Sequence, residues 1–189
     1  MRLGNLVIIM ALLVLVSCAP SQGPVDASPN LRFGAPTPTA PRDVRPSSRD
    51  PCVSPLGASA WESLGFSGTG VSRVLPSGER SCRLEGPNRE RFASLIIVPT
   101  RDVLVDTYRV RQFALFAPIT VAGLPGTREQ ASAGSLSCAI TVGTAEGQGF
   151  IMNFDQGSLA SGGQAGDPCG EGQRVAERIV AALPPLTVK

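Results

Sequence analysis

Residues 167–185 read DPCGEGQRVAERIVAALPP, and this stretch predicts the most clearly defined element of the chain, a helix. Its apolar and small residues recur at spacings of three and four, which places them on one helical face: Gly172, Val175, Ala176, Ile179, Ala182 and Leu183. Asp167 is suited to cap the first turn, and Pro184-Pro185 ends the helix. A helix with a single apolar face has to pack against another layer, so a sheet is expected upstream.

Upstream of this helix, several short segments have the alternating or continuous apolar pattern of strands. They cover residues 71–75, 81–85, 93–98, 119–122, 136–142 and 149–154. A short helix is expected over 54–64, ended by Gly65, and another over 102–108. Residues 156–166 are rich in Gly and Ser and predict a mobile loop. The pattern indicates an α+β fold, a mostly antiparallel sheet with a short N-terminal helix and the C-terminal helix packed on it.

Composition excludes several classes of chemistry. The 189 residues carry 17 basic and 15 acidic side chains, and this near-balance argues against binding of nucleic acid. The chain has no His, which removes Ser-His and Cys-His nucleophile pairs and His-ligated metals, and its one Lys is the last residue, Lys189. We therefore expect neither a cofactor nor a metal, and no enzymatic activity.

The N-terminus carries an export signal. Arg2 precedes the apolar run LVIIMALLVLV at 6–16, which is too short to span a bilayer and matches the core of a secretory signal peptide over 1–17. Residues 15–18, LVSC, resemble the lipobox of bacterial lipoproteins. That resemblance implies cleavage before Cys18 and lipidation of its thiol with diacylglycerol, carrying acyl chains such as palmitate. The alternative is an ordinary signal peptide with Cys18 incidental.

Residues 18–49 follow without periodicity. Eight of the 17 prolines lie between Pro20 and Pro51, and the large apolar residues in this stretch are Leu31 and Phe33. Because such a composition buries little surface, the segment is expected to be a disordered tether between the lipid and a folded domain over 50–189.

Four cysteines remain after Cys18, and an even number in an exported chain predicts two disulfides. Cys52 and Cys169 each end an Asp-Pro-Cys tripeptide ahead of a predicted helix, whereas Cys82 and Cys138 lie in predicted strands. The simplest pairing joins each helix entry to the nearer strand, giving Cys52–Cys82 and Cys138–Cys169. The pairing Cys52–Cys169 with Cys82–Cys138 stays open, since three connectivities are possible.

Candidate catalytic groups are few. Ser67, in the sequence GFSGTG at 65–70, has no base to activate it and is better explained as a turn. Acid pairs that could serve a glycosidase are Asp102 with Asp106 and Glu85 with Glu90.

Two further features could contact partners. A basic cluster between residues 89 and 111 could contact anionic lipid or a wall polymer, or form a solvated surface paired with nearby acids: Arg89, Arg91, Arg101, Arg109 and Arg111. Trp61 is expected in the core, and its exposure would instead mark a partner surface.

The cysteine frame resembles a known family. The elements that carry the resemblance are the two Asp-Pro-Cys tripeptides, the strand CAITV at 138–142 and the helix VAERIVAALP at 175–184. Together with the lipobox and the Pro-rich stretch, they look like the actinobacterial lipoproteins grouped as domain of unknown function 3558 (DUF3558). The resemblance implies a cell-envelope lipoprotein without established activity.

These expectations combine into one functional hypothesis. The chain is expected to be a monomeric, non-enzymatic binding or adaptor module, held on the outer face of the cytoplasmic membrane by its lipid. Its partner would be an envelope protein or a small apolar ligand bound between sheet and helix. The alternative is a carboxylate-dependent envelope enzyme that acts on wall carbohydrate.

Overall fold

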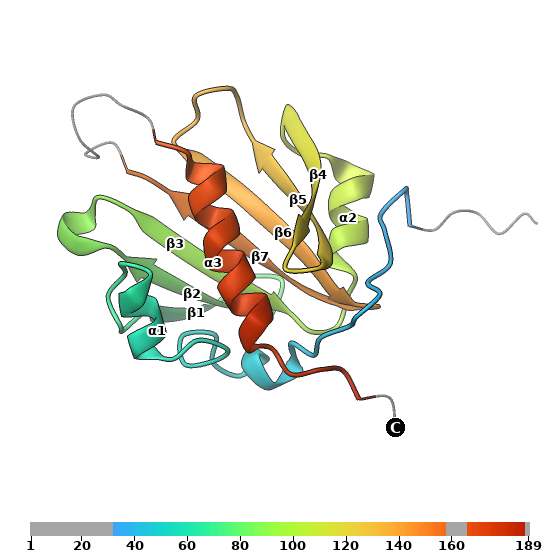
Figure 1. Cartoon of the computed structure of the whole chain (residues 1–189), viewed down its shortest axis with the longest axis horizontal. Helices are drawn as coiled ribbons and strands as arrows, with labels where there is room; N and C mark the ends of the chain where they lie inside the picture. Colours follow the sequence, from blue (N-terminus) through green and yellow to red (C-terminus); the bar gives the residue numbers. More distant parts are fainter. Residues whose placement is uncertain (1–31, 158–165, 188–189) are drawn as a thin grey trace, which may run out of the picture.

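The computed structural model of the chain describes residues 32–157 and 166–187, and within them seven strands form one antiparallel sheet (Figure 1). Across the sheet the strands run in the order β1-β2-β3-β7-β6-β5-β4. Their bounds are β1 Val71–Val74, β2 Arg80–Glu85, β3 Phe92–Val98, β4 Leu115–Val121, β5 Leu124–Gln130, β6 Ser137–Ala145 and β7 Gln148–Asp155. The antiparallel α+β architecture expected from the sequence is confirmed.

Three α-helices accompany the sheet in the described residues: α1 Ala58–Ser63, α2 Val103–Val110 and α3 Pro168–Ala182. Two short 3₁₀ turns, η1 Arg45–Ser48 and η2 Pro87–Arg89, lie in the connections. Helix α3 crosses one face of the sheet over β6 and β7 (Figure 1), and we call this side the helix face. The opposite side, where α2 packs, we call the α2 face.

Helix α3 begins and ends as its sequence predicts. The Asp167 carboxylate accepts a hydrogen bond from the Gly170 backbone N–H at 2.9 Å, which caps the first turn, and the helix stops before Pro184. One detail of its predicted apolar face is wrong, because Ala182 is exposed and Val180 is buried instead. Val180 packs in the main hydrophobic core together with Ala176 and Ile179.

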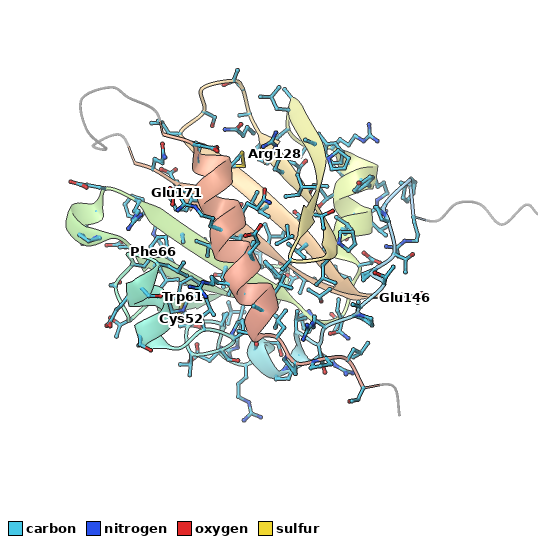
Figure 2. All side chains as sticks on the ribbon, in the orientation of Figure 1. Cys52, Trp61, Phe66, Arg128, Glu146 and Glu171 are labelled. Carbon is cyan, nitrogen blue, oxygen red and sulfur yellow. A yellow bond between two sulfur atoms is a disulfide. The ribbon has the colours of Figure 1, made fainter. Side chains whose placement is uncertain are left out.

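The main core lies between the helix face of the sheet and helices α1 and α3. Trp61 of α1 is fully buried and meets Phe66 edge to face, and Phe66 meets Phe154 of β7 in the same way. Figure 2 shows Trp61 and Phe66 close together beside Cys52. Trp61 is therefore a core residue, as expected, and not part of a partner surface.

Helix α2 packs closely against the opposite face because two strand residues there lack side chains. Gly143 of β6 and Gly149 of β7 are directly paired, and a Cβ at either position would collide with Leu104 or Val103 of α2. Leu104 is fully buried in a small second cluster with Tyr108 and Ala35. These glycines therefore fix where α2 covers the α2 face.

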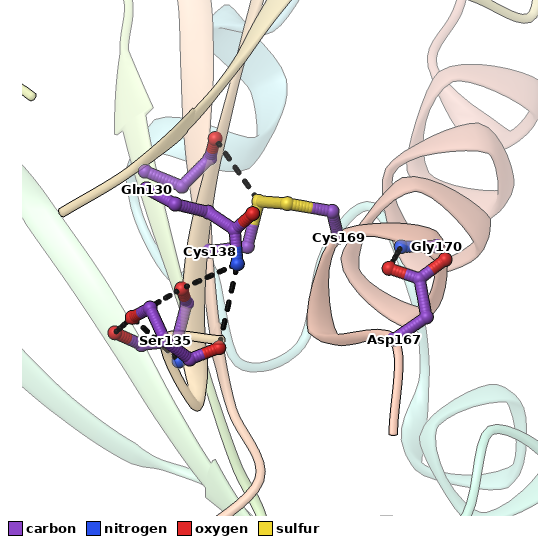
Figure 3. Close-up of a disulfide and its surroundings, with 8 residues drawn as sticks. Gln130, Ser135, Cys138, Asp167, Cys169 and Gly170 are labelled. Carbon is purple, nitrogen blue, oxygen red and sulfur yellow. Dashed lines mark hydrogen bonds between the residues drawn. A yellow bond between two sulfur atoms is a disulfide. The ribbon is translucent and has the colours of Figure 1, made fainter. Parts of the chain in front are cut away.

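Both predicted disulfides are present. Cys52–Cys82 joins the segment before α1 to β2 with 5.0 Å between Cα atoms, and Cys138–Cys169 joins β6 to the first turn of α3 with 5.1 Å. Figure 3 shows the second bridge beside the Asp167 cap of α3. The preferred pairing is confirmed and the alternative pairing is wrong, because each helix-side cysteine lies over the strand nearer in sequence.

Strand β5 was not predicted from the sequence. It follows β4 through a tight turn in which Ala122 and Gly123 both have positive φ, 47° and 85°, as a two-residue hairpin loop requires. Its residues PGTREQ at 125–130 are mostly polar, so they lack the apolar signal of a strand.

The first predicted helix is shorter than expected. Helix α1 begins at Ala58 and not at Ser54, because residues 50–54 form a turn. In this turn the Asp50 carboxylate accepts a hydrogen bond from the Cys52 N–H at 3.0 Å. The first Asp-Pro-Cys therefore caps a turn that presents Cys52 to β2, whereas the second starts a helix.

The predicted tether 18–49 is wrong over residues 32–49, which pack along the folded domain (Figure 1). Val44 is fully buried in the main core, and its N–H donates to Gln148 Oε1 at 3.1 Å. Arg42 forms an antiparallel bridge with Pro185, beyond the end of α3. We call residues 32–49 the strap. A few buried apolar residues and backbone hydrogen bonds hold the strap on the domain. Its proline-rich composition gives no indication of these contacts.

The signal peptide 1–17, Cys18 and most of the predicted loop 156–166 lie outside the described residues. Within the described part of the chain, no helix has the length and apolar character needed to cross a membrane.

Candidate functional site

One half of the α2 face is not covered by α2 and carries a row of side chains that crosses five strands. The pairing register aligns Arg83 of β2, Ser94 of β3, Asn153 of β7, Ala139 of β6 and Glu129 of β5. Directly paired residues of antiparallel strands point to the same side of a sheet, so these five share one face. We call them the central row.

A cavity of about 320 Å³ lies over the central row. The next row along the strands adds Phe92, Asp155 and Ser137, which the register also aligns. Phe113, from the connection between α2 and β4, lines the cavity as well. Two phenyl rings, small residues and several hydrogen-bonding groups therefore surround one hollow, which we call the open-face cavity.

Glu129 is the most unusual residue of this cavity. Its side chain lines the hollow, yet the residue is only 6% exposed. Its Oε1 oxygen has no hydrogen-bond partner among the described residues. Burial raises the pKa of the Glu129 carboxyl above its usual value of 4.5, because water solvates the carboxylate poorly there. A buried carboxyl with an unpaired oxygen is costly to the fold and calls for an explanation.

The other end of the central row carries a positive charge. The Arg83 guanidinium lies over the Phe92 ring, 4.3 Å from its centroid, and its Nε is 3.9 Å from a Glu85 oxygen. Stacking on the ring holds the guanidinium beside the cavity. The cavity thus has a cation at the β2 end, a buried carboxyl at the β5 end, and the neutral groups of Ser94 and Asn153 between them.

A second hollow lies on the helix face, between α1 and α3. Its polar part, about 570 Å³, is lined by residues that include Arg91 and Glu171, and its apolar part, about 300 Å³, is lined by Leu56 and the end of α3. Two of its charged groups already have partners. Arg91 donates two hydrogen bonds to the Gly65 carbonyl oxygen, and Glu171 forms an ion pair with Arg174. The apolar part of this groove suits a small apolar ligand.

The acid pairs suggested by the sequence do not form open pairs. Asp102 caps α2 by accepting from the Val105 N–H at 3.1 Å, and it is paired with Arg32 at 2.7 Å. Asp106 is held by Arg101 at 2.6 Å and Arg109 at 2.8 Å. Each of these carboxylates has a cationic neighbour, contrary to what a glycosidase pair requires.

Glu85, Glu90 and Ser67 are not arranged as catalytic groups either. Glu85 pairs with Arg89 at 3.2 Å, and Glu90 is an exposed residue at the end of η2. Ser67 Oγ donates to the Thr69 carbonyl at 3.1 Å and lies in an exposed loop after α1. Ser67 is thus part of a turn, as expected from its sequence.

The arginines between residues 89 and 111 do not form one basic patch. Arg91 binds the carbonyl of Gly65, Arg101 binds Glu79 and Asp106, and Arg111 lies 4.9 Å from the centroid of Phe116. This placement favours a solvated surface paired with nearby acids over a surface that contacts anionic lipid or a wall polymer.

Sequence reasoning missed the open-face cavity because it depends on strand register. Glu129 lies in β5, the strand without an apolar signal, and Ser94 and Asn153 are ordinary polar positions of alternating strands. The Ala122-Gly123 dipeptide was the feature of the sequence that could have indicated a hairpin and therefore β5. A strand after that hairpin places Glu129 on the same side of the sheet as Thr127.

The fold and its two disulfides indicate in which compartment the protein works. Two disulfides that tie helix-side segments to a seven-stranded antiparallel sheet indicate a protein of an oxidising, extracytoplasmic compartment.

Comparison with protein families then identifies the chain as a member of DUF3558, described as "Protein of unknown function", whose model matches residues 13–182. The family resemblance drawn from the cysteine frame is confirmed. Searches of the curated proteins and of the solved structures gave no match.

Proposed function

We propose that this protein is a lipid-anchored binding module of the actinobacterial cell envelope, without catalytic activity, and that the open-face cavity is its binding site. The observation that carries the proposal is the buried Glu129 carboxyl, whose Oε1 has no hydrogen-bond partner among the described residues, in a cavity rich in hydrogen-bonding groups. A ligand that donates a hydrogen bond to this carboxyl compensates for the cost of its burial.

The strap bears on the position of the domain relative to the membrane. Arg32 is paired with Asp102 at the start of α2 and lies 14 residues beyond Cys18. Fourteen residues span at most about 50 Å when fully extended, so a lipid on Cys18 keeps the α2 end of the domain within that distance of the bilayer. A lipid-anchored protein of this length acts close to the membrane, on ligands that reach the inner layer of the envelope.

The anchor is tested by expressing the full chain in a bacterium that processes lipoproteins and labelling the cells with a palmitate analogue. We expect label on the wild-type protein and none on the Cys18→Ala variant, which should leave the membrane fraction. Unlabelled wild-type protein would overturn the anchor.

Binding at the cavity is tested with the mature protein and with small-molecule and oligosaccharide fractions of the host envelope, by the shift of the melting temperature. The matched variant is Ala139→Phe, which fills the middle of the central row without touching the helix face. We expect at least one fraction to stabilise the wild type and not the variant. Equal shifts in both proteins, or no shift in any fraction, would overturn the cavity as the binding site.

A carboxylate-dependent enzyme acting on wall carbohydrate is the second candidate, because Glu129 and Asp155 line the same cavity and the pKa of Glu129 is raised. The binding module is favoured because the Asp155 carboxylate accepts from the Gly157 N–H at 2.7 Å, which holds it at the end of β7, and because Arg83 lines the cavity beside it. Release of reducing ends from envelope polysaccharide by the purified protein would establish the enzyme.

A further inference from the structure

The chemistry of the open-face cavity restricts its ligand, provided that the proposed binding function holds. Arg83 and Glu129 stand at the two ends of the central row, four strand spacings apart, which is about 19 Å between their Cα atoms. The cavity over the row, about 320 Å³, is at the small end of ligand sites. This geometry suits one compact unit in the hollow, with neighbouring units extending along the row.

Charge excludes simple ions as the preferred ligand. An anion would approach Glu129 and Asp155, two acidic side chains of the same hollow. A monovalent cation would satisfy Glu129 but would share the cavity with Arg83 and leave Ser94 and Asn153 unused. Neither kind of ion matches a lining that offers both signs of charge.

An apolar ligand fits the lining no better. It would cover the Asn153 amide and the Ser94 hydroxyl without supplying hydrogen bonds, and unpaired buried polar groups cost about 1–3 kcal/mol each. An apolar molecule is better matched by the groove between α1 and α3, where Leu56 and the alanines at the end of α3 provide the lining.

A neutral polyhydroxylated ligand satisfies every group in the cavity. A hydroxyl both donates and accepts, so one molecule can donate to Glu129 and Asp155 and accept from Arg83 and Asn153. Phe113 offers an apolar surface for the C–H side of such a ligand.

We propose that the open-face cavity binds a segment of neutral polysaccharide, one sugar residue of which lies over Ala139 and donates a hydroxyl to the buried carboxyl of Glu129. The small side chain of Ala139 leaves the space for the ring, and Asn153 and Arg83 bind hydroxyls further along the row. This hydrogen bond compensates for the burial of the Glu129 side chain, which lines the cavity and is only 6% exposed.

The test is a titration of the full mature protein, by calorimetry, with neutral tetrasaccharides of glucose, N-acetylglucosamine, mannose and galactose. The comparison probes are an anionic galacturonate tetramer, a cationic glucosamine tetramer and a saturated fatty acid. We expect at least one neutral probe to bind at least tenfold more tightly than all three comparison probes.

Variants assign the binding to the cavity. We expect Glu129→Gln and Asn153→Ala each to weaken binding of the neutral probe about tenfold or more, while both proteins keep the wild-type circular dichroism spectrum. The matched control is Arg178→Ala, in the groove between α1 and α3, which should bind as the wild type does. Unchanged affinity in Glu129→Gln, or equal losses in the control, would overturn the proposal.

The outcome also separates this proposal from the binding function on which it rests. If no neutral tetrasaccharide binds but another ligand stabilises the wild type and not Ala139→Phe, the binding module stands and the carbohydrate ligand is refuted. If nothing binds in a way that Ala139→Phe abolishes, both proposals fail.

Discussion

Replacing Glu129 with Gln should make the protein relatively more stable as the pH rises. Glu129 is 6% exposed, and one of its oxygens has no partner within the described residues. Burial raises the pKa of its carboxyl in the folded state, whereas the unfolded chain titrates near 4.5. Below that pH the carboxyl is protonated in both states, so the titration has no effect on the free energy of unfolding.

As the pH rises through 4.5, the unfolded chain loses this proton first, and stability falls until the folded carboxyl has also ionised. Above the pKa of the folded state, the loss of stability caused by Glu129 no longer changes with pH. Each unit by which the folded pKa exceeds the unfolded pKa corresponds to about 1.4 kcal/mol, and an unsatisfied buried polar group costs about 1–3 kcal/mol. Gln cannot ionise, so we expect the Gln variant to gain stability relative to the wild type between about pH 4 and pH 8, by about 1.4 kcal/mol for each unit by which the folded pKa of Glu129 is raised.

The measurement is urea denaturation of both proteins across this pH range, followed by the fluorescence of Trp61, which is fully buried and will report unfolding. The matched control is the same change at a solvent-exposed position, Glu146→Gln, in the turn after β6 and labelled in Figure 2 at the edge of the molecule. The prediction would be refuted if the difference in the free energy of unfolding between Glu129→Gln and the wild type did not change with pH. It would also be refuted if the wild type gained stability relative to the variant as the pH rises.

Three further changes test the packing described above. Leu104→Ala should cost about 2–5 kcal/mol in the free energy of unfolding, because Leu104 is fully buried between α2 and the glycines of the sheet; a loss below 1 kcal/mol would contradict that packing. Val44→Ala should cost about 1–3 kcal/mol by denaturant unfolding, because its side chain is buried in the main core; no loss would return the strap to a disordered tether. Removing Cys138–Cys169 by a double change to Ala should cost about 3.5 kcal/mol, the chain-entropy value for its sequence separation of 31; an unchanged melting temperature would contradict it.

The parts of the fold that the sequence predicts correctly are those with a local, repeated signal. The stripe of α3 recurs over 15 residues between an aspartate cap and a proline pair, so one amphipathic pattern defines the helix. The disulfide pairing follows from similar local facts, since each bridge closes a loop of about 30 residues and joins neighbours along the chain.

The parts that the sequence does not reveal depend on long-range contacts. β5 is defined by its pairing with β4 and β6, and its mostly polar residues give no apolar pattern by which the sequence would reveal it. The strap carries many prolines, but Val44 enters the core and Arg42 pairs with a residue 143 positions further along the chain, Pro185. The composition of such a segment reflects its average polarity and does not show that single residues, such as Val44, are buried in the core.

The extent of α2 explains why a site exists on this face of the sheet. Helix α2 has eight residues and covers the sheet only where Gly143 and Gly149 allow close approach, so the rows beyond them stay uncovered. An uncovered antiparallel face needs only polar side chains in contact with water. Glu129 departs from that rule, because its carboxyl is buried beside the open rows and has no described partner on its Oε1 oxygen. Solvation alone does not account for a buried acid at this position, whereas a ligand that donates a hydrogen bond there does, and this asymmetry is the physical reason to look for binding at the open-face cavity.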